Sequence, residues 1–313
     1  HSLPLLMGVE TVQVNSELAA RTEAARTFAF TGPASGGVLA ASDSTSWREV
    51  NAAWKAGRQV YRNLTTGDFT IGRAAPGFQA LRKPRVGVYR SHVPSMDEGW
   101  TRWILEHFGW QYTRASNARI RQGRLREEFD AIVFPDQAPQ TIQNGYRQGA
   151  MPAEYLGGLG AEGAAALKEF AESGGKLIFL NDASEYAISD LGVAARNVLS
   201  GVSSRDFYCP GSLLNVTVEA ASPLTLGLPR EFTVWMESSP AFEPAPGVRT
   251  VARYKASGVL ASGWLLGEKH IAGKAALADV VMGKGRAILF GFRPQDRAQS
   301  YLTLKLLFNA LVM

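Results

Sequence analysis

The chain has 313 residues, of which 46% are hydrophobic and 19% are charged, so it can bury a large core and is long enough for two domains. Its formal net charge is +5, and the basic residues are scattered, with no cluster longer than Arg119 to Arg126, so we expect no nucleic-acid partner. The single cysteine, Cys209, excludes an internal disulfide framework and a thiolate metal cluster. No apolar run approaches the roughly 18 residues needed to span a membrane.

Residues 1–82 are predicted to form a small N-terminal α/β region. The alternating residues from Val9 to Val14 indicate an edge strand, and Ser46 to Glu49 has the spacing of a capping box that begins a helix. Further short strands are expected at 27–30, 37–41, 60–62 and 69–71. The segment 73–83 contains proline and glycine and has the composition of a linker, which places a domain boundary near residue 82.

Residues 83–313 are predicted to form an α/β body with a doubly wound, mostly parallel sheet. The apolar run 84–89 indicates a buried first strand, Asp97 and Glu98 open a helix, and 129–136 indicates a second buried strand. Ligand sites of such sheets lie beyond the carboxyl ends of the strands. The loop 90–97 and the segment from Asp136 onwards are therefore the predicted site face.

The rest of the body alternates loops, strands and helices. A glycine-containing loop, 137–160, leads into a helix at 161–173; its glycines allow either tight turning or a phosphate cradle, although neither G-x-G-x-x-G nor a P-loop is present. A third buried strand, 176–180, runs into Asn181–Glu185. Later strands are expected at 213–218, 232–236, 248–254, 259–265, 276–281 and 286–291, and a final helix at 295–312.

These residues carry a resemblance in two parts. The strand ending at Leu180 and the late segment Gly291–Gln295 resemble the class I glutamine amidotransferase-like fold, a flavodoxin-like doubly wound sheet. Three sequence segments resemble the C-terminal portion of a group of bacterial secreted zinc carboxypeptidases: Ser95–Trp103, Pro152–Gly160 and Phe207–Ser212. In that group a carboxypeptidase A-like domain precedes the amidotransferase-like one.

The resemblance implies a parent protein of which this chain is a part. The chain begins at His1 with neither an initiator Met nor a basic n-region, so we expect a fragment. Its expected partner is the parent peptidase domain, and a peptide or sugar ligand is a further option. Zinc and proteolysis are expected only in the missing metallocarboxypeptidase domain, and the implied location is secreted or periplasmic.

The resemblance also implies which residues an active member would need. A catalytic cysteine would follow the third strand, and His-Pro-Glu would stand near the end of the chain. The corresponding positions here are Ala183, Arg293 and Gln295. Arginine stays protonated and cannot act as a base, and glutamine has no carboxylate. We therefore expect a pseudoenzyme module with a structural, docking or substrate-recognition role and with no catalytic residues, cofactor or metal of its own.

Two alternatives remain open on the sequence. One is a hydrolase with a non-standard site around His92, Ser184 and Cys209, although Ser184 also fits a helix cap and Cys209 a half-buried turn. The other is a stand-alone sugar or peptide binding module. The binding candidates at the site face are His92, Asp97, Glu98, Asp136, Asn181, Asp182, Ser184 and Arg293. They fit a solvated rim, a paired network that holds a vacated pocket shut, or a recognition site for a charged ligand.

Overall fold

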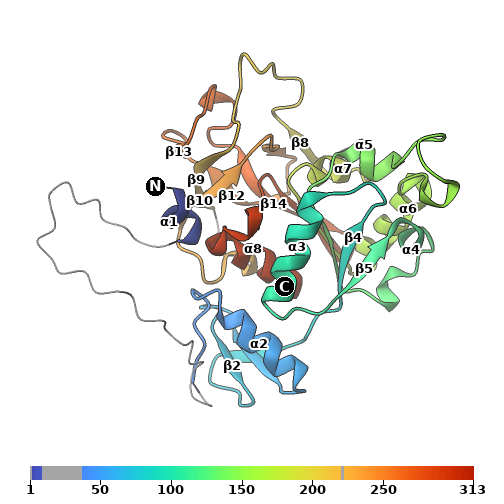
Figure 1. Ribbon diagram of the computed structural model, residues 1–313. Helices are drawn as coiled ribbons and strands as arrows, with labels where there is room; N and C mark the ends of the chain where they lie inside the picture. Colours follow the sequence, from blue (N-terminus) through green and yellow to red (C-terminus); the bar gives the residue numbers. More distant parts are fainter. Residues whose placement is uncertain (1, 9–36, 220–221) are drawn as a thin grey trace, which may run out of the picture.

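The computed structural model describes residues 2–8, 37–219 and 222–313 (Figure 1). The strand expected at 9–14 and the run at 27–30 lie outside these residues. The helices are α1 (Ser2–Met7), α2 (Ser46–Lys55), α3 (Met96–His107), α4 (Asn117–Arg121), α5 (Pro139–Asn144), α6 (Gly160–Glu172), α7 (Ala183–Ser189) and α8 (Tyr301–Val312).

The strands form a small and a large sheet. They are β1 (Val60–Asn63), β2 (Phe69–Ile71), β3 (Phe78–Leu81), β4 (Val86–Arg90), β5 (Tyr112–Ser116), β6 (Ala131–Phe134), β7 (Lys176–Leu180), β8 (Ala195–Asn197), β9 (Ser212–Val218), β10 (Glu231–Met236), β11 (Phe242–Pro244), β12 (Arg249–Tyr254), β13 (Leu260–Ser262), β14 (Ala275–Met282) and β15 (Gly285–Phe290). The small sheet has the order β2-β1-β3, and the main path of the large sheet is β10-β9-β12-β14-β15-β7-β6-β4-β5.

The large sheet has a parallel half and an antiparallel half. Strands β15, β7, β6, β4 and β5 pair in parallel, and numbering these five along the chain gives the order 2-1-3-4-5 of flavodoxin-like sheets. From β15 the sheet continues through β14, β12, β9 and β10, which pair antiparallel. The expected doubly wound α/β fold is confirmed.

Both faces of the inner strands β4, β6 and β7 are buried, which is why these strands are mostly apolar. Along β7, Ile178 and Leu180 join a core that includes residues of α3 and α8. Leu177 and Phe179 point the other way, into a core that includes residues of α4, α6 and α7. All four side chains are 0% exposed.

The expected arrangement of the first strands needs one correction. The stretch between Gly109 and Phe129, expected as a polar connection, contains β5 and α4. Strand β5 is an edge strand whose Thr113 and Arg114 are exposed, so it lacks the apolar run that marks the buried strands. Helix α3 therefore connects β4 to β5, and the chain crosses back through α4 to place β6 on the other side of β4. This makes β4 and β6 the switch point of the sheet.

The glycine-containing loop 137–160 is more ordered than expected, because it holds α5 and a short 3-10 turn at Ala153–Tyr155. Its glycines allow two backbone segments to touch. A Cβ at Gly145, where φ is 57°, would lie 2.1 Å from the carbonyl oxygen of Gly157, and a Cβ at Gly158 would lie 2.4 Å from that of Ile142. Close backbone approach thus accounts for these glycines.

The N-terminal region packs onto the α8 side of the body. Helix α2 begins at Ser46 as expected, but the capping box is wrong: Thr45 is the N-cap without a side-chain bond, and the Ser46 hydroxyl donates to the Ala40 carbonyl. Trp47 is 1% exposed, and its ring centroid lies 5.9 Å from that of Phe308 in α8. The core on the α3 and α8 face therefore continues into the first 82 residues.

The antiparallel half curls back toward the parallel strands. The backbone N–H of Arg293, just after β15, donates to the carbonyl of Trp235 in β10 at 3.3 Å, although β14, β12 and β9 separate these strands in the sheet. Helix α1 contacts both β10 and α8 (Figure 1). The end of the edge strand β10 is thereby brought to the site face.

Candidate functional site

Four loops meet at the carboxyl edge of the parallel strands. Since β4, β6, β7 and β15 run in parallel, the segments that follow them emerge at the same edge. These segments are 91–95 after β4, Asp136 after β6, Asn181–Asp182 after β7 and Arg293 after β15. Helix α3 begins next to them, with Ser95 as N-cap accepting a hydrogen bond from the Glu98 N–H.

Arg293 lies at the centre of this edge. Its Nη2 is 2.5 Å from Asp136 Oδ2, its Nε is 3.5 Å from Asp97 Oδ2 and its Nη1 is 3.4 Å from Glu237 Oε2. Nη1 also donates to the Glu237 carbonyl at 2.8 Å. The Arg293 side chain is only 15% exposed. A planar guanidinium with five donors can satisfy several carboxylates at once, so the guanidinium is held from three sides.

The loops around Arg293 carry more acid than base. Burial lowers the pKa of Arg293, but the Asp136 and Asp97 carboxylates outweigh it and raise that pKa. Burial raises the pKa of Asp97 to about 6, although Arg293 opposes the shift. Burial and, to a smaller extent, the nearby Asp136 carboxylate raise the pKa of Asp182 to about 6. Burial also raises the pKa of Asp296 to about 6. Arg293 therefore offsets only part of the cost of burying these carboxyls.

Gln295, which the sequence was expected to place where an active member has its orienting acid, is fully buried. Its Nε2 donates to Asp97 Oδ1 at 3.2 Å and to Thr101 Oγ1 at 3.3 Å, while its Oε1 has no hydrogen-bond partner among the described residues. The amide thus joins α3 to the loop after β15. Neither of these two bonds involves a histidine that the amide could orient.

The turn from β7 into α7 is strained at Asn181. This residue has φ of 53°, in the left-handed region, and its side chain is 0% exposed with no hydrogen-bond partner among the described residues. A nucleophile elbow holds its nucleophile at such a strained strand-to-helix turn. The sequence assigned the nucleophile position to Ala183, but the strained residue is Asn181, two positions earlier, and its amide cannot attack a carbonyl. Ala183 is also 0% exposed.

Ser184 is buried inside the turn. Its hydroxyl lies 3.3 Å from the Phe179 carbonyl and 3.1 Å from the Phe290 carbonyl, and it is 0% exposed. It therefore links β7 to β15 and does not cap α7, whose N-cap is Asp182. A hydroxyl whose proton is directed at main-chain carbonyls, without an adjacent base, is not activated for attack.

His92 and Cys209 have surroundings that differ from those of Ser184. His92 is exposed and its ring lies 5.3 Å from that of Tyr155. Cys209 is 6% exposed, not half-buried as expected; its thiol lies 3.4 Å from the Met236 carbonyl, and burial raises its pKa. These three side chains therefore interact with different partners.

A small cavity of about 270 Å³ lies at the switch point between β4 and β6. His92, Ser95 and Glu98 line it. Glu98 is 8% exposed and pairs with Arg102 at 2.8 Å. Of the expected binding residues, the structure thus gathers Asp97, Asp136 and Arg293 into one network, places Asp182 beside it through a bond from its N–H to Asp136 Oδ1, and leaves His92 and Glu98 at the separate cavity.

Sequence reasoning missed Glu237, Asp296 and Thr101. Glu237 follows the antiparallel strand β10 and reaches Arg293 only because the sheet curls, which no local pattern reveals. Asp296 could have been found, since it lies three positions after Arg293 in the same loop. Thr101 lies one turn into α3 from Asp97, on the side that faces Gln295.

The network offers no evident place for a metal ion. Among the described residues, no three or more His, Cys, Asp or Glu side chains form a group that could hold one. Arg293 itself provides the positive charge between Asp97 and Asp136.

No helix within the described part of the chain is long and apolar enough to cross a membrane.

Comparisons with known proteins give structural likenesses only. No protein-family model matches the chain, and no curated protein matches it. A chain of the PurLQS structure from Thermotoga maritima is 16% identical, with a TM-score of 0.48, over 74% of this chain and 98% of that one. A protein described as a GMP synthase component, from Thermoplasma acidophilum, is 11% identical, with a TM-score of 0.44, over 73% and 95%.

A third structure, described as a ThuA-like protein from Bacteroides uniformis, is 12% identical, with a TM-score of 0.41, over 76% of this chain and 92% of that one. At these identities and TM-scores the likeness says nothing about the activity of this chain.

Proposed function

We propose that this chain is a noncatalytic accessory module in which a paired network closes the site face of an amidotransferase-like fold. The observation that carries the proposal is Arg293, which contacts the carboxylates of Asp97, Asp136 and Glu237 where an active member would have its base. A guanidinium remains protonated at physiological pH and cannot accept a proton. The role of the network is to hold the loops of the site face together.

The strand-to-helix turn supports the same proposal. Asn181 occupies the strained position after β7, and Ser184 is turned toward main-chain carbonyls. Neither residue has, among the described residues, the partner that nucleophilic catalysis needs, namely an imidazole or another base within hydrogen-bond reach. The hydrolase alternative would need Ser184 or Cys209 next to His92, and the contacts of each are made elsewhere.

The parent remains a proposal that rests on the resemblance of the sequence. We propose that the module belongs to a secreted or periplasmic bacterial zinc carboxypeptidase, docks onto its peptidase domain, and leaves zinc binding and proteolysis to that domain. The coding sequence upstream of His1 tests this directly. A peptidase domain with a zinc-binding His-x-x-Glu motif is the expected result, and an unrelated upstream region would contradict it.

The catalytic part of the proposal is tested by incubating the purified chain with glutamine, a peptide and a carboxylic ester. We expect no ammonia, amine or alcohol release above the uncatalysed rate, because no nucleophile and base are paired among the described residues. Ser184→Ala and Cys209→Ala are the matched variants. Turnover by the wild-type chain that either variant abolishes would overturn the proposal, whereas equal background rates in all three support it.

A further inference from the structure

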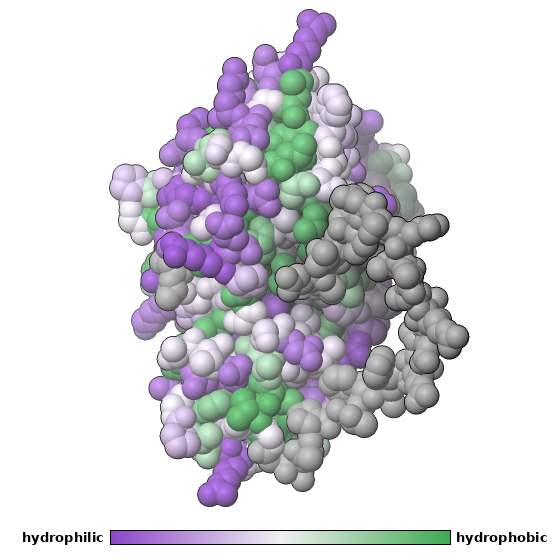
Figure 2. All heavy atoms as spheres, turned by 90° about the vertical axis from the view of Figure 1, so that its left-hand side faces the viewer, coloured by the Kyte–Doolittle hydropathy of each residue, from purple (hydrophilic) through white to green (hydrophobic). Residues whose placement is uncertain are grey.

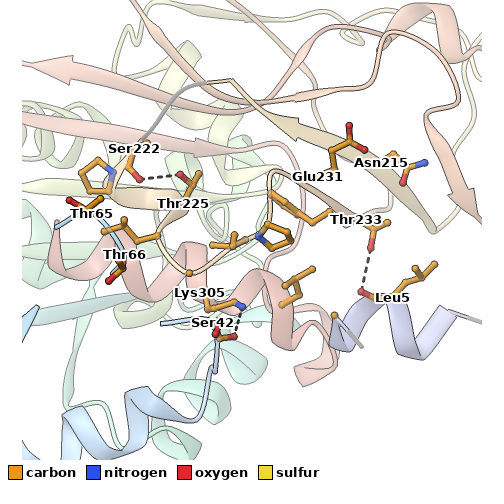
Figure 3. A pocket seen from close by; sticks show the side chains of 18 of the residues that line it. Leu5, Ser42, Thr65, Thr66, Asn215, Ser222, Thr225, Glu231, Thr233 and Lys305 are labelled. Atoms are coloured by element: carbon orange, nitrogen blue, oxygen red, sulfur yellow. Dashed lines mark hydrogen bonds between the residues drawn. The ribbon is translucent and has the colours of Figure 1, made fainter. Parts of the chain in front are cut away.

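A second part of the molecule, separate from the Arg293 network, contains a much larger cavity of about 1110 Å³. It lies between α1, β10, α8 and the segment 222–229, with the turn at 64–66 on one side (Figure 3). Leu5, Leu226, Phe232 and Leu302 contribute apolar walls, and hydroxyl side chains such as Thr66 and Thr225 lie among them. This volume is in the range of cavities that take small-molecule ligands.

Lys305 of α8 lines this cavity. The residue is only 4% exposed, and its Nζ donates to the Ser42 carbonyl at 2.7 Å (Figure 3). An ammonium has three donor hydrogens, and this is the one bond that the described residues give it. No described carboxylate forms an ion pair with Lys305. A buried charge with so few partners is unfavourable unless a counter-charge reaches it.

The other charged side chain that lines the cavity is already paired. Glu231 lies at the start of β10 and forms an ion pair with Lys255 at 2.5 Å. Among the described residues that line the cavity, Lys305 is the only cation. The cavity therefore offers one positive charge to a ligand, and a second ligand carboxylate would find no cation to pair with among the described residues that line it.

The surface nearby does not suggest a broad docking face. Figure 2 turns toward the viewer the side on which α1 lies in Figure 1, and on its coloured atoms the hydrophobic areas are separated by hydrophilic side chains. A hollow with one buried charge suits a small ligand better than a flat protein partner.

We propose that this cavity binds a small organic monocarboxylate with an aliphatic body, whose carboxylate pairs with Lys305 Nζ and whose body packs against the side chains of Leu226, Phe232 and Leu302. A charge-assisted hydrogen bond to a desolvated ammonium is among the stronger polar contacts in proteins. The site shares no residue with the Arg293 network, so it does not depend on the proposed noncatalytic function.

The protonation of Lys305 agrees with this geometry. Burial lowers the pKa of Lys305 to about 8, although the Asp43 carboxylate opposes the shift. Asp43, from the segment before α2, is the carboxylate that raises this pKa, and Glu231, from β10, is the carboxylate that lines the cavity. The amine is charged at pH 7 and becomes neutral above pH 8. Binding of a carboxylate should therefore weaken about tenfold for each pH unit above 8.

The test is calorimetric titration of the full chain with octanoate, octan-1-ol and octanedioate. At pH 7 we expect saturable binding of octanoate, with at least tenfold weaker binding of the uncharged alcohol and of the dicarboxylate. Lys305→Met should reduce octanoate affinity at least tenfold. Lys176→Met is the matched control, because Lys176 is another lysine with carbonyl partners and a pKa lowered to about 8 by burial, yet it does not line the cavity.

Several results would overturn the proposal. Absence of saturable octanoate binding to the wild-type chain would do so, and so would equal affinity for octanoate and octan-1-ol. Octanoate affinity that stays constant from pH 7 to pH 10 would exclude Lys305 as the partner. These measurements use the wild-type chain, so they hold even if Lys305→Met fails to fold.

Discussion

Two of the cations that the molecule buries, Arg293 and Lys305, have opposite surroundings. Arg293 lies among three carboxylates at the carboxyl edge of the parallel strands, whereas Lys305 lies beside a large cavity with one main-chain carbonyl as its acceptor. The first cation has more negative charge nearby than it can neutralise. The second has no ion-pair partner among the described residues. Arg293 therefore closes its site with partners that belong to the protein, whereas Lys305 leaves room for a ligand to supply the counter-charge.

The difference follows from which elements supply the two residues. Arg293 is in a loop, and the parallel strands bring Asp97 and Asp136 to it from neighbouring strand ends. Lys305 is in the apolar helix α8, and the elements that pack around it contribute mostly apolar and hydroxyl side chains. The comparison predicts opposite effects when each cation is removed.

The largest expected effect is that of Arg293→Met. The variant leaves Asp97, Asp136 and Glu237 without their cation, and breaking such a buried network by removing one partner costs about 3–5 kcal/mol of the free energy of unfolding. Denaturant unfolding at pH 7 measures this loss. At pH 5 the loss should be smaller, because Asp97, whose pKa is about 6, becomes protonated.

Arg82→Met is the control for this variant. Arg82 is 73% exposed, and its partner Asp130 retains ion pairs with Arg85 and Arg126. Its loss should cost less than about 1 kcal/mol, as is usual for exposed pairs. Equal stability of Arg293→Met and the wild type would show that the network does not hold the loops together.

A second prediction concerns pH. The pKa of Asp97, Asp182 and Asp296 is raised from 3.8 to about 6, so these carboxyls favour folding most below pH 4 and lose that contribution as the pH rises through 6. Asp182→Asn should therefore raise the free energy of unfolding at pH 7 by about 2 kcal/mol and flatten its decrease between pH 4 and pH 7.

This pH window is distinct from that of Asp130. Burial would raise the pKa of Asp130, but hydrogen bonds from Arg85 outweigh burial and lower that pKa. The stabilising contribution of Asp130 is therefore lost only below pH 4. Unfolding curves of Asp182→Asn at pH 4, 5, 6 and 7 make the test. A pH dependence identical to that of the wild type would contradict the assignment to Asp182.

The smallest expected effect is that of Lys305→Met on stability. Replacing a desolvated ammonium by an apolar side chain of similar length should raise the free energy of unfolding at pH 7 by about 1 kcal/mol. The gain should shrink above pH 8, where the wild-type amine becomes neutral. Thermal or denaturant unfolding at pH 7 and pH 9.5 measures both values. A loss of more than about 2 kcal/mol would mean that a carboxylate of the chain already pairs with Lys305.

Much of the fold could be predicted because burial on both faces leaves a local signal. The runs that become β4, β6, β7 and β15 are mostly apolar, and each was expected within a few residues of its observed bounds. The edge strand β5 was not expected, because its exposed positions carry polar residues. The pattern of apolar residues identifies buried strands, but an edge strand with two exposed polar positions does not show that pattern.

The candidate site was predictable only in part. Parallel strand ends meet at one edge, so placing Asp97, Asp136 and Arg293 on one face follows from topology. The contact between Arg293 and Glu237 depends on the curl of the antiparallel half. The cavity beside Lys305 depends on how α1, α8 and β10 pack. Both involve residues far apart in the chain, and no spacing in the sequence encodes them.

The most direct test of the central claim is the coupling free energy between Arg293 and Asp136. It comes from denaturant unfolding of the wild type, Arg293→Met, Asp136→Asn and the double variant, all at pH 7. If the pair holds the site face together, the coupling should favour the pair by about 2 kcal/mol or more. Additive effects of the two substitutions would contradict the account.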